Sequence, residues 1–441
     1  MIKRFWWVAA IAFSVCAPAY AALQIQSWTL DNGARVLFVE NRSIPILDVS
    51  VEFDAGSRRD PAGKAGTADL TVAMLARGLR EATGPRSEPA MSEAAISDAF
   101  ADLAAQRGGG AGADRAGATL RTLSSSRERE TSVALLARIL AHPAFPADLL
   151  ARDKARTIAA IKEDETKPES IGNKAFWRMM YGDHPYAQHE TVASVEAIGR
   201  DDLVNFHRTH YVANRAVISM IGDVSRNEAD AIARELTARL PQGAPLPALP
   251  PVQLPPPREQ YIAHPASQAH ILLGVPAIVR GDPDYFPLLV GNYTLGGGGF
   301  VSRLTHEVRE KRGLSYSVYS YFNPMAQAGP FQAGLQTQKD QADEALKIVR
   351  STIADFLREG PTQQELKAAK DNLVGGFALR IDNNRKILDN IAAIGFYGLP
   401  LDYLDTWTAR VSKVTAAEIR AAFQRKIALD KMTTVVVGNE K

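Results

Sequence analysis

The stretch Leu295–Phe322, LGGGGFVSRLTHEVREKRGLSYSVYSYF, governs how the rest of the chain is interpreted. Four consecutive glycines lead into a segment with Phe300, Leu304 and Val308 at helical spacing. A glycine then ends the helix, and the alternating run that starts at Tyr316 predicts a strand. The sequence therefore predicts a glycine loop, an amphipathic helix whose apolar side includes those three residues, and a strand.

This glycine loop has the composition of a phosphate cradle but not its motif. The G-K-[ST] of a P-loop does not follow the glycines, and the chain has no G-x-G-x-x-G after a strand. What remains is a flexible backbone beside Arg309 and Tyr316. A guanidinium and a phenol hydroxyl at one turn can donate to a carbonyl, or to an oxyanion that develops on it. A surface arginine and an ordinary strand tyrosine are the alternative interpretation.

The overall composition argues against a nucleic-acid partner. The 441 residues carry a net charge of only +2, with the two signs interspersed along the chain. Nucleic-acid binding requires a concentrated basic face, which this pattern does not provide. Length alone predicts two or three domains with sizeable cores.

The first residues predict a signal peptide. Two basic residues precede the apolar run 5–15, and a small-residue motif, A-Y-A, ends at Ala21. The apolar run is short for a bilayer span, so we expect no stable membrane anchor. The single cysteine, Cys16, lies inside this segment, which predicts a mature chain without disulfide or thiol chemistry. We expect residues 1–21 to be removed on export to a bacterial periplasm.

The chain repeats one order of elements. Residues 241–257 contain eight prolines, an extended tract that predicts a linker between domains at 22–240 and 258–441. Both parts close on an apolar strand and a glycine, VISMIG at 217–222 and TTVVVG at 433–438. Strands separated by clustered helices predict an α+β fold with two homologous domains, each packing helices on one face of an antiparallel-rich sheet.

Three shorter segments give local predictions. Asn32-Gly33 lies between apolar runs and predicts a hairpin over 28–39. Ile46–Phe53 alternates like a half-buried strand, and we expect it at a sheet edge where an extended peptide could pair with it. Gly108–Gly117 is rich in glycine and predicts a turn between strands.

No histidine pair has the spacing of a helical zinc site. Two histidines four apart with a glutamate between them would place all three ligating or catalytic groups on one helix face. His184 and His189 instead lie in a predicted loop, and they leave only a displaced metal site as an alternative. His207 and His210 fall near a helix end, where histidine interacts with the dipole and free carbonyls. His306 has no second histidine at helical spacing, and a solvated helix face is the simpler interpretation.

The opening stretch resembles the second-half signature of the pitrilysin (insulinase-like) zinc peptidases, which include the mitochondrial processing peptidase. GSRRDPAGKAGTADLTVAMLARG at 56–78 is similar to the segment that carries the inverted zinc motif, H-x-x-E-H, in that family. YGDHPY at 181–186 and HRTHYVANRAVISMIGDVS at 207–225 resemble further family segments. The resemblance covers essentially the whole mature chain.

The zinc motif itself is missing. Asp69 stands where the family has its first histidine, and Val72 and Ala73 replace the catalytic glutamate and the second histidine. The family's third ligand, a glutamate on a later helix, falls near Asp153. Valine and alanine supply neither a base nor a ligand, so we expect no metal on this chain.

The resemblance implies two α+β domains that close like a clamshell around a peptide. Several members are heterodimers in which one subunit has the zinc motif, and an arginine–tyrosine pair opposite the zinc binds the substrate. Arg309 and Tyr316 match that pair in residue type and seven-residue spacing. The resemblance thus implies a zinc-free subunit that supplies this pair in trans to a zinc-bearing homologous partner.

In that assembly the substrate is a peptide or unfolded polypeptide. The glycine loop admits the substrate backbone closely or flexes during closure, which assigns a substrate-binding role to Gly296, Gly297, Gly298 and Gly299. The alternative is a catalytically dead peptide-binding or scaffold protein of the same fold.

Overall fold

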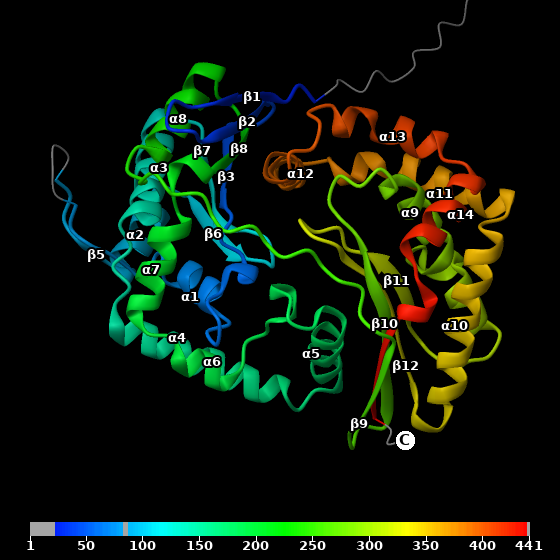
Figure 1. The fold of residues 1–441 in the computed structure, drawn as a ribbon. Helices are drawn as coiled ribbons and strands as arrows, with labels where there is room; N and C mark the ends of the chain where they lie inside the picture. The colour runs from blue at the N-terminus through cyan, green and yellow to red at the C-terminus, as the bar shows by residue number, and fades with distance from the viewer. Residues whose placement is uncertain (1–22, 83–86, 439–441) are drawn as a thin grey trace, which may run out of the picture.

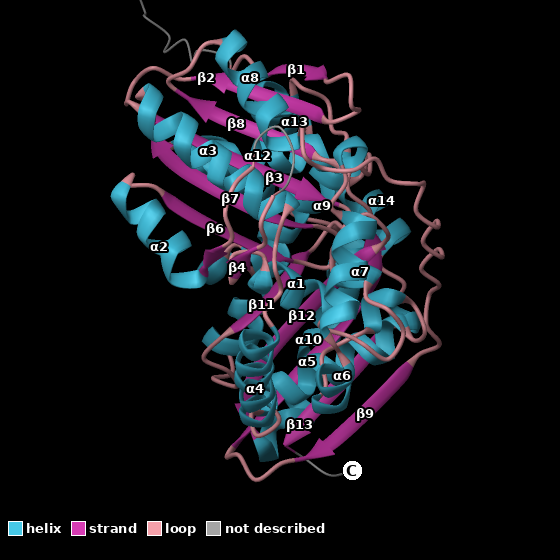
Figure 2. Ribbon diagram, turned by 90° about the vertical axis from the view of Figure 1, so that its left-hand side faces the viewer, coloured by secondary structure: helices cyan, strands magenta, loops and turns pink. Residues whose placement is uncertain are grey.

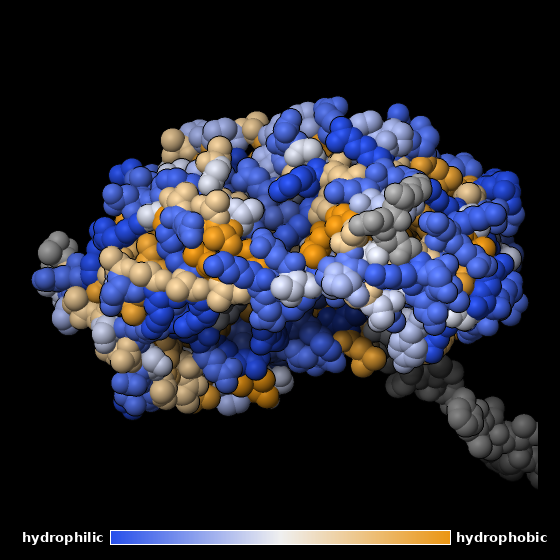
Figure 3. All heavy atoms as spheres, turned by 90° about the horizontal axis from the view of Figure 1, so that it is seen from below, coloured by the Kyte–Doolittle hydropathy of each residue, from blue (hydrophilic) through white to orange (hydrophobic). Residues whose placement is uncertain are grey.

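The computed structural model describes residues 23–82 and 87–438. Two sheets with their helices lie side by side as the halves of a clamshell (Figure 1), and the proline-rich residues 241–257 connect them without helix or strand. The predicted signal peptide, residues 1–21, lies outside the described residues. Within the described ranges, no helix is long and apolar enough to cross a membrane. Seen from below, the surface is mostly hydrophilic, with hydrophobic patches near its middle (Figure 3).

The N-terminal sheet has six strands in the order β1-β2-β8-β3-β7-β6. Neighbours run antiparallel except β2 and β8, which run parallel. The predicted hairpin joins β1 and β2, and Gly33 takes the positive φ of 87° that its turn requires. The strands of this sheet are β1 (Gln26–Thr29), β2 (Arg35–Glu40), β3 (Ile46–Phe53), β6 (Gln106–Ala111), β7 (Ala116–Leu123) and β8 (Val217–Gly222). Two short strands, β4 (Gly78–Leu79) and β5 (Met91–Ser92), form a separate antiparallel pair.

One expectation about this sheet is wrong, and another is correct only in part. β3, expected at an edge, is hydrogen-bonded to β8 on one side and β7 on the other, so it has no free edge for a peptide. The edge strands are β1 and β6. Glycines 108–110, expected in a turn, lie inside edge strand β6, and the turn itself follows at 112–115.

The C-terminal sheet repeats this arrangement with five strands in the order β11-β12-β10-β13-β9. β13 and β8, the two apolar strands that end in glycine, each pair with one parallel and one antiparallel neighbour. This shared pattern is what the repeated element order predicts. The strands are β9 (Arg258–Ala263), β10 (Gln268–Ile278), β11 (Val318–Phe322), β12 (Gly329–Gln338) and β13 (Thr433–Gly438).

Each half has its own helices. In the N-terminal half they are α1 (Thr67–Met74), α2 (Glu93–Asp102), α3 (Ser126–Ala141), α4 (Ala147–Asp164), α5 (Pro168–Tyr181), α6 (Val192–Ala197), α7 (Arg200–His210) and α8 (Arg226–Thr237). In the C-terminal half they are α9 (Tyr285–Asn292), α10 (Ala342–Glu359), α11 (Gln363–Gly375), α12 (Asn384–Tyr397), α13 (Tyr403–Lys413) and α14 (Ala416–Lys426). α1, α3 and α8 contact the strands of the first sheet, and α9 and α10 contact those of the second.

The halves also exchange one helix each. α5 packs against β10 and β13 of the C-terminal sheet, while α12 packs against β2, β3 and β8 of the N-terminal sheet (Figure 1). Phe176 and Met180 of α5 are buried with Leu272 and Val437. Gly395 lets α12 approach β2 closely, because a Cβ there would lie 2.6 Å from the Leu37 side chain. The predicted α+β class with two similar halves is confirmed, and the structure adds this exchange.

A buried carboxylate ties the halves together. Asp114 accepts hydrogen bonds from the hydroxyls of Tyr186 (2.6 Å) and Tyr397 (2.9 Å) and from the N–H of Ala326 (2.9 Å). It also forms a buried ion pair with Arg58. Because Tyr397 and Ala326 belong to the C-terminal half, this carboxylate fixes the relative orientation of the two sheets, which Figure 2 shows from the side.

Candidate functional site

The glycine stretch forms a more irregular structure than the single helix that the sequence predicts. α9 continues into a π-helical turn at Tyr293–Gly297, a 3-10 turn covers Gly299–Val301, and a second π-helical turn spans Thr305–Glu310. Strand β11 begins at Val318 rather than at Tyr316. π turns are rare and are frequently found at functional sites. The stretch therefore has the backbone irregularity of a site rather than of a packing helix.

The predicted apolar side is only partly buried. Leu304 and Val308 are fully buried, but 67% of Phe300 is exposed. The reason is that Ser302 is extended (φ −86°, ψ 150°) and breaks the helical periodicity between Phe300 and Leu304. Sequence reasoning therefore missed Phe300 as a site residue. The available signal was its place directly after four glycines, before any helix had begun.

Phe300 belongs instead to an exposed stack around Arg309. The guanidinium of Arg309 lies 4.7 Å from the ring centroid of Phe300 and 4.6 Å from that of Tyr316, both within cation–π range. Tyr316 is 83% exposed. With the residues that the structure describes, Arg309 makes no ion pair and no side-chain hydrogen bond. The two rings thus contact the guanidinium, and its N–H donors have no partner among the described residues.

The other basic residues of the stretch are paired. Lys311 and Arg312 both bind the carboxylate of Glu307, at 2.6 and 2.8 Å. Arg303 is held by Glu365 at 2.7 Å. Arg309 therefore differs from its basic neighbours in having aromatic rather than acidic contacts.

The four glycines are required for different reasons. A Cβ on Gly296 would lie 2.6 Å from the backbone nitrogen of Ser320, and one on Gly298 would lie 2.5 Å from the Tyr293 carbonyl oxygen. A Cβ on Gly297 would lie 2.6 Å from an Asn292 side-chain nitrogen. Gly299 has open space around it and a left-handed φ of 61°. Internal packing therefore explains the first three, and backbone conformation explains Gly299.

The positions of the missing zinc motif lie on α1. Asp69 and Ala73 reach the surface, and Val72 packs partly against the N-terminal core. Asp69 is open to solvent on one side, yet the protein around it raises the pKa of its carboxyl by desolvation. In the described parts of the chain, no cluster of three or more His, Cys, Asp or Glu residues could hold a metal ion.

Asp153 does not face an open metal position. Its buried carboxylate accepts hydrogen bonds from Nε of Arg77 (2.8 Å) and Nε of Arg152 (3.1 Å). Arg77 and Arg152 also both bind Glu93. Asp153 therefore belongs to an ion-pair network beside α1, and arginine guanidinium groups bind its carboxylate.

The carboxylate of Asp60 caps the N-terminal end of α1. Asp60 accepts hydrogen bonds from the N–H groups of Gly66 (2.8 Å) and Ala68 (2.7 Å). Burial raises the pKa of Asp60 to about 7, even though these two bonds favour its charged form. Burial and the nearby Asp69 also raise the pKa of Glu190. The Asp60 carboxyl thus holds the first turn of α1 in place.

The histidines of the N-terminal half bind backbone groups. Nε2 of His184 lies 3.0 Å from the Pro250 carbonyl oxygen. His207 and His210 contact the carbonyl oxygens of Leu140 (2.7 Å) and Asp54 (2.9 Å). His189 has a buried Nε2 without a hydrogen-bond partner among the described residues, and no third ligand joins it there to form a metal site.

Comparisons with known proteins agree with this geometry. The family model described as peptidase M16 inactive domain matches residues 197–373. The crystal structure of a peptidase M16 inactive domain from Pseudomonas fluorescens has a TM-score of 0.88 at 38% identity, over 95% of this chain and 98% of that one. The non-peptidase homolog YmxG of Helicobacter pylori is 25% identical over 92% of both chains.

Two further matches are more limited. An uncharacterized zinc protease of Streptomyces coelicolor is 29% identical over 61% of this chain, and the match spans 60% of that protein. The match with the crystal structure of the periplasmic protease PqqL of Escherichia coli covers the whole of this chain and 49% of that one. Its TM-score of 0.79 at 15% identity shows a shared fold. Together with the missing zinc ligands on α1, the matches establish that the chain belongs to the pitrilysin-like peptidase M16 family, among its non-catalytic members.

Proposed function

We propose that this chain is the zinc-free, substrate-binding subunit of a two-subunit M16 peptidase. The observation that carries the proposal is the exposed stack in which Phe300 and Tyr316 hold Arg309. A homologous partner supplies the zinc and the water-activating glutamate. This chain supplies Arg309 and Tyr316 in trans, where they hold the substrate carbonyl and the tetrahedral intermediate.

The stack has the physical properties of an oxyanion-stabilising group. Because two rings position the guanidinium before substrate arrives, little reorganisation is needed when charge develops on the carbonyl oxygen. The rings contact the guanidinium without using its N–H donors, which remain available. The exposed Tyr316 hydroxyl is a second donor beside it. An arginine already bound to a carboxylate would offer fewer free donors.

The open edge of β6 supports a peptide or unfolded polypeptide as substrate. The N–H of Gly112 bonds to the carbonyl of Arg115, and this register directs the backbone of Gly110 and Gly108 toward β7. The N–H and C=O groups of the alternate residues, Arg107 and Gly109, therefore point away from the sheet. An extended peptide can add to such an edge as a further strand.

A catalytically dead peptide-binding or scaffold protein is the second candidate. The name of the Helicobacter relative, a non-peptidase homolog, favours it. A scaffold has no use for an exposed guanidinium held between two rings, so the candidates differ in what they require of Arg309. For both candidate functions we propose that the chain is located in the periplasm. Two observations support this location: the predicted signal peptide at 1–21 and the periplasmic source named for the Escherichia neighbour.

Co-purification and reconstitution test the proposal. The tagged chain, isolated from its native host, should bring with it a homologous chain that has H-x-x-E-H. The mixture should cleave a quenched fluorescent peptide library, whereas neither chain should do so alone. Metal analysis should find zinc with the partner; one zinc per copy of this chain, or cleavage by this chain alone, would overturn the proposal. Peptide binding by a chain with which no homologous chain co-purifies would favour the second candidate.

A further inference from the structure

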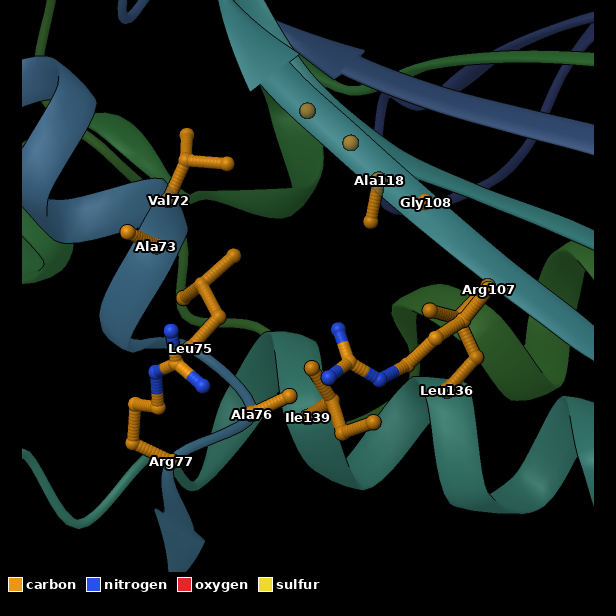
Figure 4. A pocket seen from close by; sticks show the side chains of 12 residues that line it. Val72, Ala73, Leu75, Ala76, Arg77, Arg107, Gly108, Ala118, Leu136 and Ile139 are labelled. Carbon is orange, nitrogen blue, oxygen red and sulfur yellow. The ribbon is translucent and has the colours of Figure 1, made fainter. Parts of the chain in front are cut away.

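A cavity lies beside the positions of the missing zinc motif (Figure 4). It has a volume of about 240 Å³ and is bounded by α1, α3, β6 and β7. Much of its lining is apolar, from Val72, Leu75, Ala76, Ala118, Leu136 and Ile139. Two guanidinium groups complete it, and Figure 4 shows Arg107 extending from its strand toward Arg77. The cavity thus combines an apolar wall with two cationic groups.

The two arginines differ in how their charge is balanced. Arg77 binds Asp153 and Glu93. Arg107 has no ion pair or hydrogen bond with any residue in the described ranges. With Arg152 and Arg156, four guanidiniums here share two carboxylates. Burial, and then the positive charge of Arg77, lower the pKa of Arg107, and the negative charge of Glu93 offsets only part of this.

The cavity is also placed where a peptide backbone can reach it. Arg107 lies on the edge strand β6, and its own backbone N–H and C=O groups are among those that point away from the sheet. The side chain of Leu120, directly opposite Arg107 on β7, is buried in the N-terminal core. The side chain of Arg107 therefore lies on the core face of the sheet while its backbone faces outward. A volume of 240 Å³ is below the usual range for a drug-sized ligand and suits part of a peptide.

We propose that this cavity binds a carboxylate of the peptide substrate together with an adjacent apolar side chain. Arg107 holds the carboxylate through its guanidinium, which is unpaired in the described ranges, the positive charge of Arg77 lies nearby, and the apolar wall receives the side chain. The carboxylate is the free C-terminus or an aspartate or glutamate side chain, since both present two oxygens to a guanidinium fork. The proposal rests on the proposed function, because it names the substrate class of the same peptide-binding half.

A small carboxylate tests the cavity independently of any peptide. N-acetyl-leucine is titrated into the whole chain with isotope-labelled arginine, and N-acetyl-leucinamide is the uncharged match. We expect the acid, and not the amide, to shift the Nε signal of Arg107 in NMR spectra. Arg107→Gln should weaken acid binding at least about tenfold, the loss expected for a hydrogen bond to a charged group. Arg107→Lys should retain part of the binding.

The matched control is Arg127→Gln. Arg127 is the second residue of the neighbouring helix α3, and 80% of its side chain is exposed, so its replacement should leave acid binding unchanged. Thermal melting of each variant confirms that it is folded. Equal responses to the acid and the amide, or full binding by Arg107→Gln, would overturn the proposal.

Peptides then identify the source of the carboxylate. A tryptic digest of casein is passed over the immobilised chain, and retained peptides are resynthesised with an amidated C-terminus or with their acidic side chains replaced by amides. Loss of binding on amidation assigns the C-terminus, and loss on side-chain replacement assigns an acidic residue. Equal binding of all forms defeats the cavity proposal but leaves peptide binding intact. Retention of no peptide defeats the proposed function, while the N-acetyl-leucine result still decides the cavity.

Discussion

Arg77 and Arg309, one in each half of this duplicated fold, have opposite surroundings. Beside the missing zinc motif, Arg77 is bound by the carboxylates of Asp153 and Glu93. In the glycine stretch, Arg309 lies between the rings of Phe300 and Tyr316 without an acidic partner among the described residues. Carboxylates occupy the N–H donors of a guanidinium, whereas rings contact its faces. The first arrangement suits structure, and the second suits binding.

On the proposed function, this difference separates the half of the site that has lost its metal from the half that binds substrate. Beside α1, Asp153, at the position expected for the third zinc ligand, is instead bound by Arg77 and Arg152. The stack around Arg309 leaves exposed aromatic surface, 67% of Phe300 and 83% of Tyr316, that no burial compensates. Keeping aromatic surface in water is unfavourable, and large exposed apolar surfaces mark places where a protein binds a ligand or partner.

The largest expected effect comes from separating the halves. Asp114→Ala removes a buried carboxylate that accepts bonds from Tyr397 and Ala326 across the junction and pairs with Arg58. Loss of one partner of a buried ion pair costs about 3 to 5 kcal/mol in the free energy of unfolding. Chemical denaturation measures it. As a control, Asp31→Ala removes a carboxylate that is 92% exposed and should cost under about 1 kcal/mol. Equal losses would show that the junction does not depend on Asp114.

Acidification should affect the N-terminal half first. Burial lowers the pKa of His207 from 6.5 to about 4. Between these values the unfolded chain binds a proton that the folded chain does not, so stability falls as pH falls through this range. The loss from this residue reaches about 3 kcal/mol below pH 4. Burial also lowers the pKa of four other histidines in this half, His142, His184, His189 and His210.

Hydrogen exchange at several pH values compares the two halves directly. Protection should decline first around α7, which carries His207, while the strands of the C-terminal sheet keep theirs. His207→Gln, which retains a donor for the Leu140 carbonyl, should flatten the pH dependence. His270→Gln on β10 is the matched change in the other half, where burial lowers the histidine pKa less far. An unchanged pH profile in His207→Gln would contradict the assignment to this residue.

Replacement of the stacked arginine should affect turnover rather than folding. In the reconstituted mixture, Arg309→Ala or Tyr316→Phe should lower kcat about a hundredfold, the scale of losing one oxyanion donor. Arg309→Lys should recover only part, because an ammonium lacks the planar fork. Arg312→Ala is the matched control, since Arg312 lies on the same stretch but binds Glu307. Rates that stay unchanged in Arg309→Ala would mean that the stack is structural.

The features that the sequence predicted depend on residue identity at fixed spacing. The Asn32-Gly33 hairpin, the repeated apolar strands before Gly222 and Gly438, and the absence of zinc ligands at Val72 and Ala73 are all local. Each can be recognised without knowing what the rest of the chain does. The α+β class follows from them because it needs only the order of the elements.

The features that were missed depend on contacts between distant segments. β3 alternates in sequence, but β8 and β7 cover both its edges. The exchange of α5 and α12 has no local signature, since it depends on which sheet each helix reaches. The sequence pattern placed Phe300 on the buried side of a continuous helix. The break in that helix at Ser302 depends on the surrounding packing, so the pattern does not reveal it. The pairing of Arg77 with Asp153, and the lack of a partner for Arg107 in the described ranges, are likewise tertiary facts.

The smallest expected effect concerns the glycine loop itself. Gly299 and Gly313 flank the Arg309 segment and have positive φ values of 61° and 63°, and a Cβ added to either would meet no atom within 4 Å. Alanine at either position should therefore cost about 1 kcal/mol through backbone strain alone. If Gly299 admits the substrate backbone, Gly299→Ala should also raise KM for peptide in the reconstituted mixture, whereas Gly313→Ala should not. Equal KM values in the two variants would mean that Gly299 serves only the turn, and that binding at this site depends on Arg309 and its rings.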